Sequence, residues 1–451
     1  MRWRAVSAIA VALMLVGVPG GVSADRRVVV LEVNGAIGPA IADYVANALA
    51  ETKPDDTGLV ILRMNTPGGL DASMRKIIRA ILSSPVPVAT FVAPSGARAA
   101  SAGTYISYAS AVAAMSPGTN IGAATPVALG AGSLFGGSQK KPEDSDKQDK
   151  SKSNAGEPAD TEMRKVINDA IAYIRSLAEL NGRNVDWAET AVRSAASLTA
   201  SDALKLHVID VVANDVPDLL RKIDGRTVTV AGKSVKLETA GLRVVEVAPS
   251  WRTYFLAVIT DPNVAFLLML VGIYGLILEV TTPGTLVPGI IGAISLLLAL
   301  YALNLLPINF AGAGLVLLGI GLMVAEVHIG AFGVIGIAGV VSFGIGSFMM
   351  FNSGIPGFEL SLAVVVTATI VTAVLFLLVL AMLLRSRKRP IVTGKEALLG
   401  AEGEALAWQQ EEGRVRVQGE IWRARSTRPL APGSRIKVVN REGLVLFVEP
   451  A

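Results

Sequence analysis

The sequence of 451 residues predicts an α/β domain, an α-helical transmembrane block and a small β-barrel, in that order. Strand-like and helix-like patterns alternate between Val28 and about Val247, which is typical of βαβ units built around a largely parallel sheet. No lysine or arginine lies between Arg252 and Arg385, so this stretch is apolar enough to cross a membrane. From Ile391 onward, short alternating runs separated by glycines predict an antiparallel barrel.

The composition excludes several classes of function. Hydrophobic residues make up 52% of the chain and charged residues only 17%, a balance too apolar for a soluble protein of several domains. The formal net charge of +4 is small for this length, and no basic stripe is interleaved with aromatic residues, so we expect no nucleic-acid partner. The absence of cysteine excludes disulfides, thiolate metal sites and cysteine nucleophiles, and we expect neither a metal nor a cofactor.

Residues 1–24 have the pattern of a secretory signal peptide. Arg2 and Arg4 precede a short apolar stretch, Ala5–Val18, and small residues lead to an expected cleavage site after Ala24. An uncleaved anchor is the alternative, although the apolar stretch is short for a stable span. Either interpretation places the residues that follow outside the cytoplasm.

Residues 25–250 are predicted to form the α/β domain, in which buried-strand patterns alternate with amphipathic helices. The strands are expected at 28–33, 58–64 and 88–92, and the helices at 37–51, 70–83 and 162–180. Within the domain, residues 139–160 are mostly charged or polar and hold no aliphatic side chain larger than alanine. Such a segment buries too little apolar surface to offset its chain entropy, so we expect a disordered insertion there.

Residues 251–390 are predicted to be a multi-pass transmembrane region of about five helices. The candidate spans lie near 264–282, 286–305, 311–329, 332–351 and 362–384, each close to the ~20 residues that cross the hydrocarbon core. Four spans is the main alternative, because Pro283, Pro288 and nearby glycines blur the first boundaries. The basic cluster Arg385–Arg389 should be cytoplasmic, and an export signal followed by five spans gives that orientation whereas four does not.

Residues 391–451 are predicted to fold as a small OB-type barrel. The alternating runs are 414–417, 420–424, 435–439 and 444–448. Barrels of this kind often bind ligands or partners, but nothing in these residues selects one.

Ser101 is the candidate nucleophile of the chain. It lies in the run Ala99–Gly103, where small neighbours permit a tight turn and the close approach of a substrate carbonyl. The turn Pro67-Gly68-Gly69 follows a buried strand and opens a helix, so its amides can face an anion. Each feature alone is a weak signal, because small residues also serve close packing and most such turns are only turns.

A serine nucleophile needs a base, and the sequence favours a lysine. Neither histidine is an obvious partner, since His328 lies at the end of an expected span and His207 precedes a strand in which it would pack. Lys165 is the best candidate, because it falls in the first turn of the helix at 162–180, where the helix dipole disfavours a cation. An ordinary exposed helix lysine is the alternative, and spacing alone leaves both open.

Several sequence segments, together with the order of export signal, α/β domain, membrane block and barrel, are similar to those of one protein family. The segments are Asn65–Gly69, Gly96–Ile106, Ser116–Ala123, Lys165, Ile171–Ala178, Asn181–Arg183 and Asp261–Ala265. They resemble the long NfeD-family membrane serine proteases, which are relatives of the ClpP class, and the likeness covers essentially the whole chain.

The resemblance implies a Clp/crotonase-type fold for residues 25–250, an NfeD-type OB-fold for the tail and a Ser–Lys dyad of Ser101 and Lys165. The glycine turn would supply the oxyanion hole from Gly68 and Gly69, with the Gly69 amide as first choice and the Ala102 amide as second donor. The implied substrates are apolar polypeptide segments, notably of stomatin-like membrane proteins, and a homo-oligomer is expected by analogy. Asn65 departs from the aspartate that is common in the family, and the insertion before Lys165 is long.

Two other functions are compatible with parts of the sequence. A non-catalytic scaffold would bind stomatin-like or flotillin-like proteins through the membrane block and the OB-like tail. A crotonase-like acyl-CoA enzyme would share the glycine-turn oxyanion hole, but the export signal disfavours it because CoA is cytoplasmic.

Overall fold

The structure is a computed structural model, and it describes residues 26–126, 158–282, 284, 286–329, 333–352, 354–387 and 398–451. The expected signal peptide, 1–24, lies outside these residues. So does the insertion expected at 139–160, except for its last three residues, which begin helix α4 (Pro158–Leu180). The chain divides into two compact units, one of residues up to Leu322 with Ile337–Thr369, the other of Met323–Gly336 with Ile370–Ala451.

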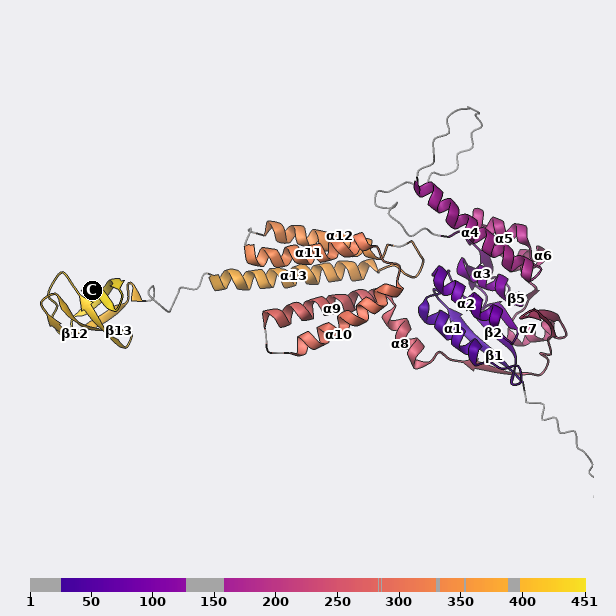
Figure 1. Cartoon of the computed structure of the whole chain (residues 1–451), viewed down its shortest axis with the longest axis horizontal. Coiled ribbons are helices and arrows are strands. Elements are labelled where there is room, and N and C mark those ends of the chain that lie inside the picture. The colour runs from indigo at the N-terminus through magenta and orange to yellow at the C-terminus, as the bar shows by residue number, and fades with distance from the viewer. Residues whose placement is uncertain are drawn as a thin grey trace, which may run out of the picture. The chain divides into compact units, whose positions relative to one another are not determined.

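A six-stranded parallel sheet forms the centre of the N-terminal domain (Figure 1). Its strands are, in spatial order, β11 (Arg243–Val247), β1 (Arg27–Asn34), β2 (Thr57–Asn65), β3 (Val88–Val92), β5 (Val112–Met115) and β8 (Val211–Val212). The central strands are nearly continuous apolar runs because both faces of a parallel sheet are covered. The predicted α/β class and the strands expected at 28–33, 58–64 and 88–92 are therefore confirmed.

Helices cover both faces of this sheet. The larger core lies under α1 (Pro39–Glu51), α2 (Asp71–Ser83), α3 (Ala102–Ala109), α4, α5 (Val185–Arg193) and α6 (Ala200–Lys205). The smaller core lies under α7 (Val216–Ile223) and the hairpin of β9 (Thr227–Val230) and β10 (Lys233–Lys236). Side chains alternate along a strand, so Val29 and Leu31 join the first core while Val28 and Val30 join the second.

A second, three-stranded sheet fixes the segment that ends at Ser101. Strand β4 (Arg98–Ala100) pairs in parallel with β6 (Asn120–Gly122), which pairs with β7 (Ser197–Thr199). A further bridge joins Thr66, just after β2, to Ala99. Ser101 therefore lies beside the turn that follows β2.

Arg183 holds the carboxyl end of α3 in place. Its buried guanidinium donates to the carbonyl oxygens of Ser107 (3.0 Å), Tyr108 (2.8 Å) and Ser110 (2.8 Å). It also pairs with Asp210 Oδ2 at 2.7 Å. These bonds satisfy carbonyls that the end of a helix leaves without partners.

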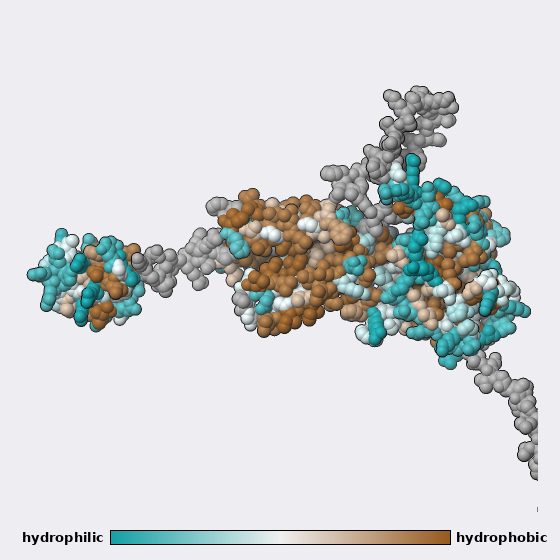
Figure 2. All heavy atoms as spheres, viewed as in Figure 1, coloured by the Kyte–Doolittle hydropathy of each residue, from teal (hydrophilic) through white to brown (hydrophobic). Residues whose placement is uncertain are grey.

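Apolar helices follow α8 (Trp251–Ile259) at all five expected positions, and apolar side chains dominate their surface in Figure 2. They are α9 (Pro262–Thr281), α10 (Val287–Leu305), α11 (Phe310–Ile329), α12 (Val334–Met350) and α13 (Leu362–Arg387). Within the described residues, four helices are long and apolar enough to span a membrane, and α12 is shorter. The transmembrane block is confirmed, and the fifth span stays a prediction.

The hairpin of α9 and α10 is closed by a carboxylate. Glu279, near the end of α9, accepts hydrogen bonds from the amides of Leu286 (3.2 Å) and Gly289 (3.3 Å) at the start of α10. Gly272 lies so close to the partner helix that a Cβ there would be 2.7 Å from Leu296 Cβ.

The next two helices repeat this arrangement 47 residues later, since Glu326 follows Glu279 by that interval. Glu326, near the end of α11, accepts from the amides of Gly333 (2.9 Å) and Gly336 (3.3 Å), both displaced by the same interval from the donors to Glu279. The close approach recurs too, because a Cβ on Gly319 would be 2.6 Å from the Phe343 amide nitrogen. The membrane block therefore contains a tandem repeat of one helical hairpin.

The C-terminal residues form a closed five-stranded barrel, as predicted. Its order is β12 (Glu402–Gln409), β13 (Glu412–Val417), β14 (Glu420–Arg425), β16 (Val445–Pro450) and β15 (Arg435–Glu442). Neighbours pair antiparallel except β14 and β16, which pair in parallel. The inward side chains of the alternating strands fill a small apolar core.

Candidate active site

Ser101 stands at a strained backbone position between β4 and α3. Its φ of 50° and ψ of −113° place a non-glycine residue in a region that L-residues rarely adopt. The surrounding bonds hold it there, because the Ser101 amide donates to the Gly122 carbonyl (2.9 Å) and the Thr104 amide donates to the Ser101 carbonyl (2.9 Å). The hydroxyl is thereby presented at the start of a helix.

Two glycines let the turn after β2 approach Ser101. A Cβ on Gly68 would lie 2.8 Å from Ser101 Cβ and 3.2 Å from its Oγ. A Cβ on Gly69 would lie 2.3 Å from the Ile37 carbonyl oxygen. Both positions therefore need glycine, for close approach as well as for the turn.

The amides around Ser101 differ in their partners. The Gly68 amide donates to Thr66 Oγ1 at 3.1 Å. In the bridge to Ile37, the Ile37 amide donates to the Gly68 carbonyl (2.8 Å) and the Leu70 amide donates to the Ile37 carbonyl (2.9 Å). The Gly69 amide takes no part in this bridge. The Ala102 amide belongs to the first turn of α3, where amides have no partner within the helix. Neither the bridge nor helix α3 thus supplies an acceptor to the Gly69 and Ala102 amides.

Ser101 lines a cavity of about 460 Å³. The other lining residues come from the turn after β2, from α2, α3 and α4, from the segment after β6, from the end of α10 with the residues that follow it, and from the connection between α12 and α13. They are Pro67, Gly69, Leu70, Asp71, Ala72, Met74, Arg75, Ala102, Tyr105, Ala124, Pro126, Ala170, Tyr173, Leu305, Leu306, Pro307, Ile355 and Pro356.

One side of this cavity is polar. Arg75 pairs with Asp71 (2.9 Å) and Asp169 (2.6 Å), and its guanidinium lies 4.4 Å from the centre of the Tyr173 ring. Partial burial, the largest single influence, lowers the pKa of Arg75, but the two carboxylates together outweigh it and raise that pKa. Burial raises the pKa of Tyr105. Near neutral pH this side therefore carries a fixed cation and an uncharged phenol.

The structure does not bring Lys165 to Ser101. The Lys165 side chain is 70% exposed and its Nζ lies 3.6 Å from Glu162 Oε1. Its helix reaches the cavity further along, through Ala170 and Tyr173. The Ser–Lys dyad expected from the sequence is therefore not assembled here.

Neither histidine takes the place of the lysine. His207 is exposed in the turn after α6, so the expectation that it packs in a strand was wrong. His328 is also exposed, and its Nδ1 lies 3.0 Å from the Val324 carbonyl oxygen. Within the described ranges, no three His, Asp or Glu side chains gather as metal ligands would.

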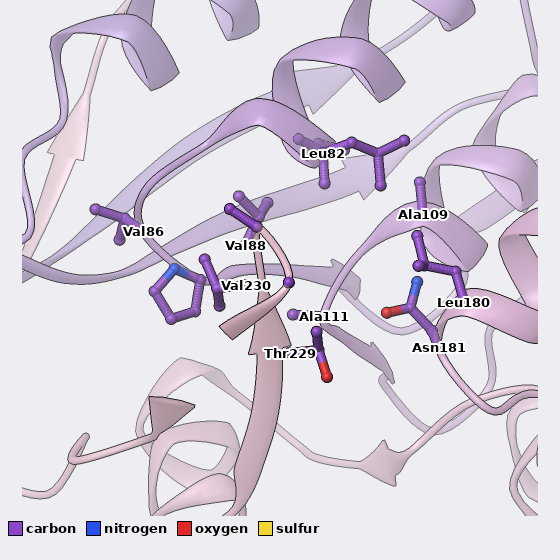
Figure 3. Close-up of a pocket in the computed structure, with 13 residues that line it drawn as sticks. Leu82, Val86, Val88, Ala109, Ala111, Leu180, Asn181, Thr229 and Val230 are labelled. Atoms are coloured by element: carbon purple, nitrogen blue, oxygen red, sulfur yellow. The ribbon is translucent and has the colours of Figure 1, made fainter. Parts of the chain in front are cut away.

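A second cavity, of about 280 Å³, shares no lining residue with the first (Figure 3). Leu82, Val86, Val88, Leu180 and Val230 contribute to its largely apolar wall. None of the residues lining it carries a titratable side chain, so it offers no general acid or base.

Sequence reasoning missed the polar side of the cavity that holds Ser101. Asp71 and Arg75 form an i,i+4 pair on α2 directly after the glycine turn, and that spacing was the available signal. Asp169 and Tyr173 are likewise one turn apart on α4. Their meeting with Arg75 depends on the packing of two helices far apart in the sequence.

Three protein-family models, all of NfeD domains, match successive parts of the chain. The model of the NfeD1b N-terminal domain matches residues 27–231, and the model of the NfeD integral membrane domain matches residues 263–382. The model of the NfeD-like C-terminal, partner-binding domain matches residues 395–450.

Similar proteins are known from archaea and bacteria. The membrane-bound protease PH1510 of Pyrococcus horikoshii is 34% identical over 446 residues, which cover 97% of this chain and 96% of that protein. The membrane protein NfeD1b of Bacillus subtilis is 26% identical over 340 residues, covering 73% and 69%. A solved structure of the 1510-N membrane protease specific for a stomatin homolog from Pyrococcus horikoshii is 33% identical, covering 52% of this chain and 99% of that one with a TM-score of 0.41.

The order of the matched regions agrees with the three parts of the structure. The first lies in the α/β domain, the second in the apolar helices and the third in the barrel. Because a 34% identical relative also extends over nearly the entire length, the chain belongs to the NfeD family of membrane proteins.

Proposed function

We propose that this protein is a membrane-anchored serine endopeptidase that cleaves apolar polypeptide segments of stomatin-like membrane proteins. The observation that carries the proposal is the position of Ser101, which faces a cavity on a strained bend beside the Gly69 and Ala102 amides. Membership of a family with a relative named as a membrane-bound protease supports it. The stomatin-like substrate rests on the family resemblance of the sequence motifs.

The proposed reaction uses Ser101 and Lys165 as a dyad. Neutral Lys165 accepts the Ser101 hydroxyl proton while Oγ attacks the peptide carbonyl carbon. The Gly69 and Ala102 amides stabilise the oxyanion of the tetrahedral intermediate, with Gly68 shaping the turn. Its collapse breaks the C–N bond, and the lysine ammonium returns the proton to the leaving amine. Water then hydrolyses the acyl-enzyme by the same route.

Helix α4 begins at Pro158, so Lys165 does not lie in its first turn as the sequence predicted. The dyad requires the part of α4 around Lys165 to approach Ser101. Lys165 would have to leave Glu162, a contact between two exposed side chains that costs little to break. Binding of a substrate in the cavity, against Ala170 and Tyr173 of the same helix, is the event that we infer draws α4 inward.

The orientation and assembly follow from the same proposal. An export signal and five spans, with the shorter α12 counted as a span, would place the α/β domain outside the cytoplasm and the barrel inside it. A homo-oligomer is proposed by analogy with Clp-type folds. The barrel is the proposed binding module for the stomatin-like partner, in keeping with its match to a partner-binding domain.

The test uses the full chain in detergent with an apolar peptide substrate. Wild-type protein should cleave it, and Ser101→Ala and Lys165→Ala should each abolish cleavage. Lys205→Ala is the matched control, because Lys205 is 75% exposed and pairs with Asp202 three residues earlier as Lys165 pairs with Glu162. Equal cleavage by all variants would exclude the dyad. No cleavage by wild type, with retained binding of a stomatin-like protein, would favour the scaffold function.

A further inference from the structure

We propose that two loops of the membrane block form one wall of the substrate cleft, and that Leu306 and Ile355 determine the preference for apolar residues there. The substrate is an apolar polypeptide segment that lies at the ends of the membrane helices. This inference rests on the proposed peptidase function and adds the residues that select its substrate.

The lining of the Ser101 cavity carries this inference. Leu305–Pro307, at the end of α10, line it, and so do Ile355 and Pro356 between α12 and α13. All of them belong to the same compact unit as Ser101. Leu306 is only 6% exposed and Ile355 only 8%, although both lie in connections between helices.

The loop that bears Ile355 packs against the α/β domain just before α1. A Cβ on Gly357 would lie 2.6 Å from Ala36 Cβ, and a Cβ on Gly38 would lie 3.1 Å from Phe358 Cζ. Phe358 is buried, and its amide donates to the Ile355 carbonyl at 3.1 Å. The turn that presents Ile355 is therefore fixed on both sides.

The two loops are also tied to the helices that bear them. The Asn309 amide donates to the Met350 carbonyl at 2.8 Å, which links the segment after α10 to the end of α12. The Ser361 amide donates to Asn263 Oδ1 at 2.9 Å, which links the start of α13 to that of α9. A wall held in this way is preorganised for binding, since little conformational freedom is lost when a ligand arrives.

The wall gives the cleft two chemically different sides. Arg75 and its carboxylates lie on the α2 and α4 side, whereas the loops contribute only aliphatic and proline side chains. An apolar substrate residue can exclude water against Leu306 and Ile355, while the peptide backbone extends past Ser101. A polar residue in the same place would lose its hydration with no partner in the wall.

The experiment compares Leu306→Asn and Ile355→Asn with wild type in the full chain. KM for an apolar peptide should rise about tenfold in each variant, as expected for removing an apolar contact from a specificity pocket. The rate at which a small fluorophosphonate labels Ser101 should stay the same, because that probe does not reach the wall. Leu286→Asn is the matched control, since Leu286 is 66% exposed with a positive φ that asparagine tolerates, and it should behave as wild type.

Ile355→Phe narrows the cleft without adding polarity, so it should shift the preference toward peptides with smaller apolar residues. Unchanged KM in both asparagine variants, or an unchanged preference in Ile355→Phe, would overturn the inference and leave the peptidase proposal intact. A wild-type protein that neither cleaves peptides nor reacts at Ser101 would overturn both.

Discussion

Gly68 lies directly against Ser101, so that a Cβ added to Gly68 would stand 2.8 Å from Ser101 Cβ and 3.2 Å from its Oγ. A Gly68→Ala substitution must therefore displace the hydroxyl, and the φ of +122° adds strain for any L-residue. Because a small misplacement of a nucleophile has a large kinetic effect, we expect kcat/KM to fall about 100-fold.

Gly96→Ala is the matched control for Gly68→Ala. Gly96 has a φ of +90°, but nothing lies within 4 Å of the Cβ it would gain. This variant should lose some stability through backbone strain and keep its activity. Thermal unfolding and peptide cleavage measured together distinguish the two. A folded Gly68→Ala protein with wild-type activity would show that the turn does not position Ser101.

Lys165→Arg should be inactive, because only an uncharged amine can accept the Ser101 proton and a guanidinium stays protonated. The kcat/KM for cleavage of the apolar peptide is the measurement. Activity retained in Lys165→Arg would show that another group is the base.

The sequence predicted the parts of the fold that depend on local patterns. The continuous apolar runs of β1 to β3 and the alternating runs of the barrel were recognisable as strands in the sequence. Ser101 was identified as a candidate because its neighbours are all small. The approach of α4 was not predictable, because it depends on how Arg75, Asp169 and Tyr173 pack across two helices. The hairpin repeat did leave a signal, since Glu279 and Glu326 are followed by glycines at matching intervals.

The cavity that holds Ser101 shows a different limit. Leu306 and Ile355 lie more than 200 residues beyond Ser101 in the chain. Read alone, each is an aliphatic residue in a short connection between apolar helices, where such residues are common. Only the three-dimensional contacts reveal that they line the same cavity as Ser101.

Arg183→Met should destabilise the α/β domain by about 3–5 kcal/mol, because it removes the buried cation that pairs with Asp210 and the side-chain donor to the Ser110 carbonyl. Arg226→Met removes a second arginine from the same carboxylate, but that side chain is 41% exposed. Its cost should be about 0–1 kcal/mol. Chemical denaturation of the two variants measures the difference, and equal losses would contradict the role given to burial.

Removing either of the two carboxylates that close the helical hairpins should lower the stability of the membrane block, by different amounts. Glu326→Ala leaves two helix-start amides without their acceptor at a site that is 1% exposed, so we expect a loss of about 1–3 kcal/mol. Glu279→Ala should cost less, because Glu279 is only half-buried and water can replace the carboxylate. His328→Ala, at an exposed neighbour of Glu326, is the control and should change little. Thermal unfolding in detergent ranks the three variants. If His328→Ala were as damaging as Glu326→Ala, the carboxylate could not be the group that closes the hairpin.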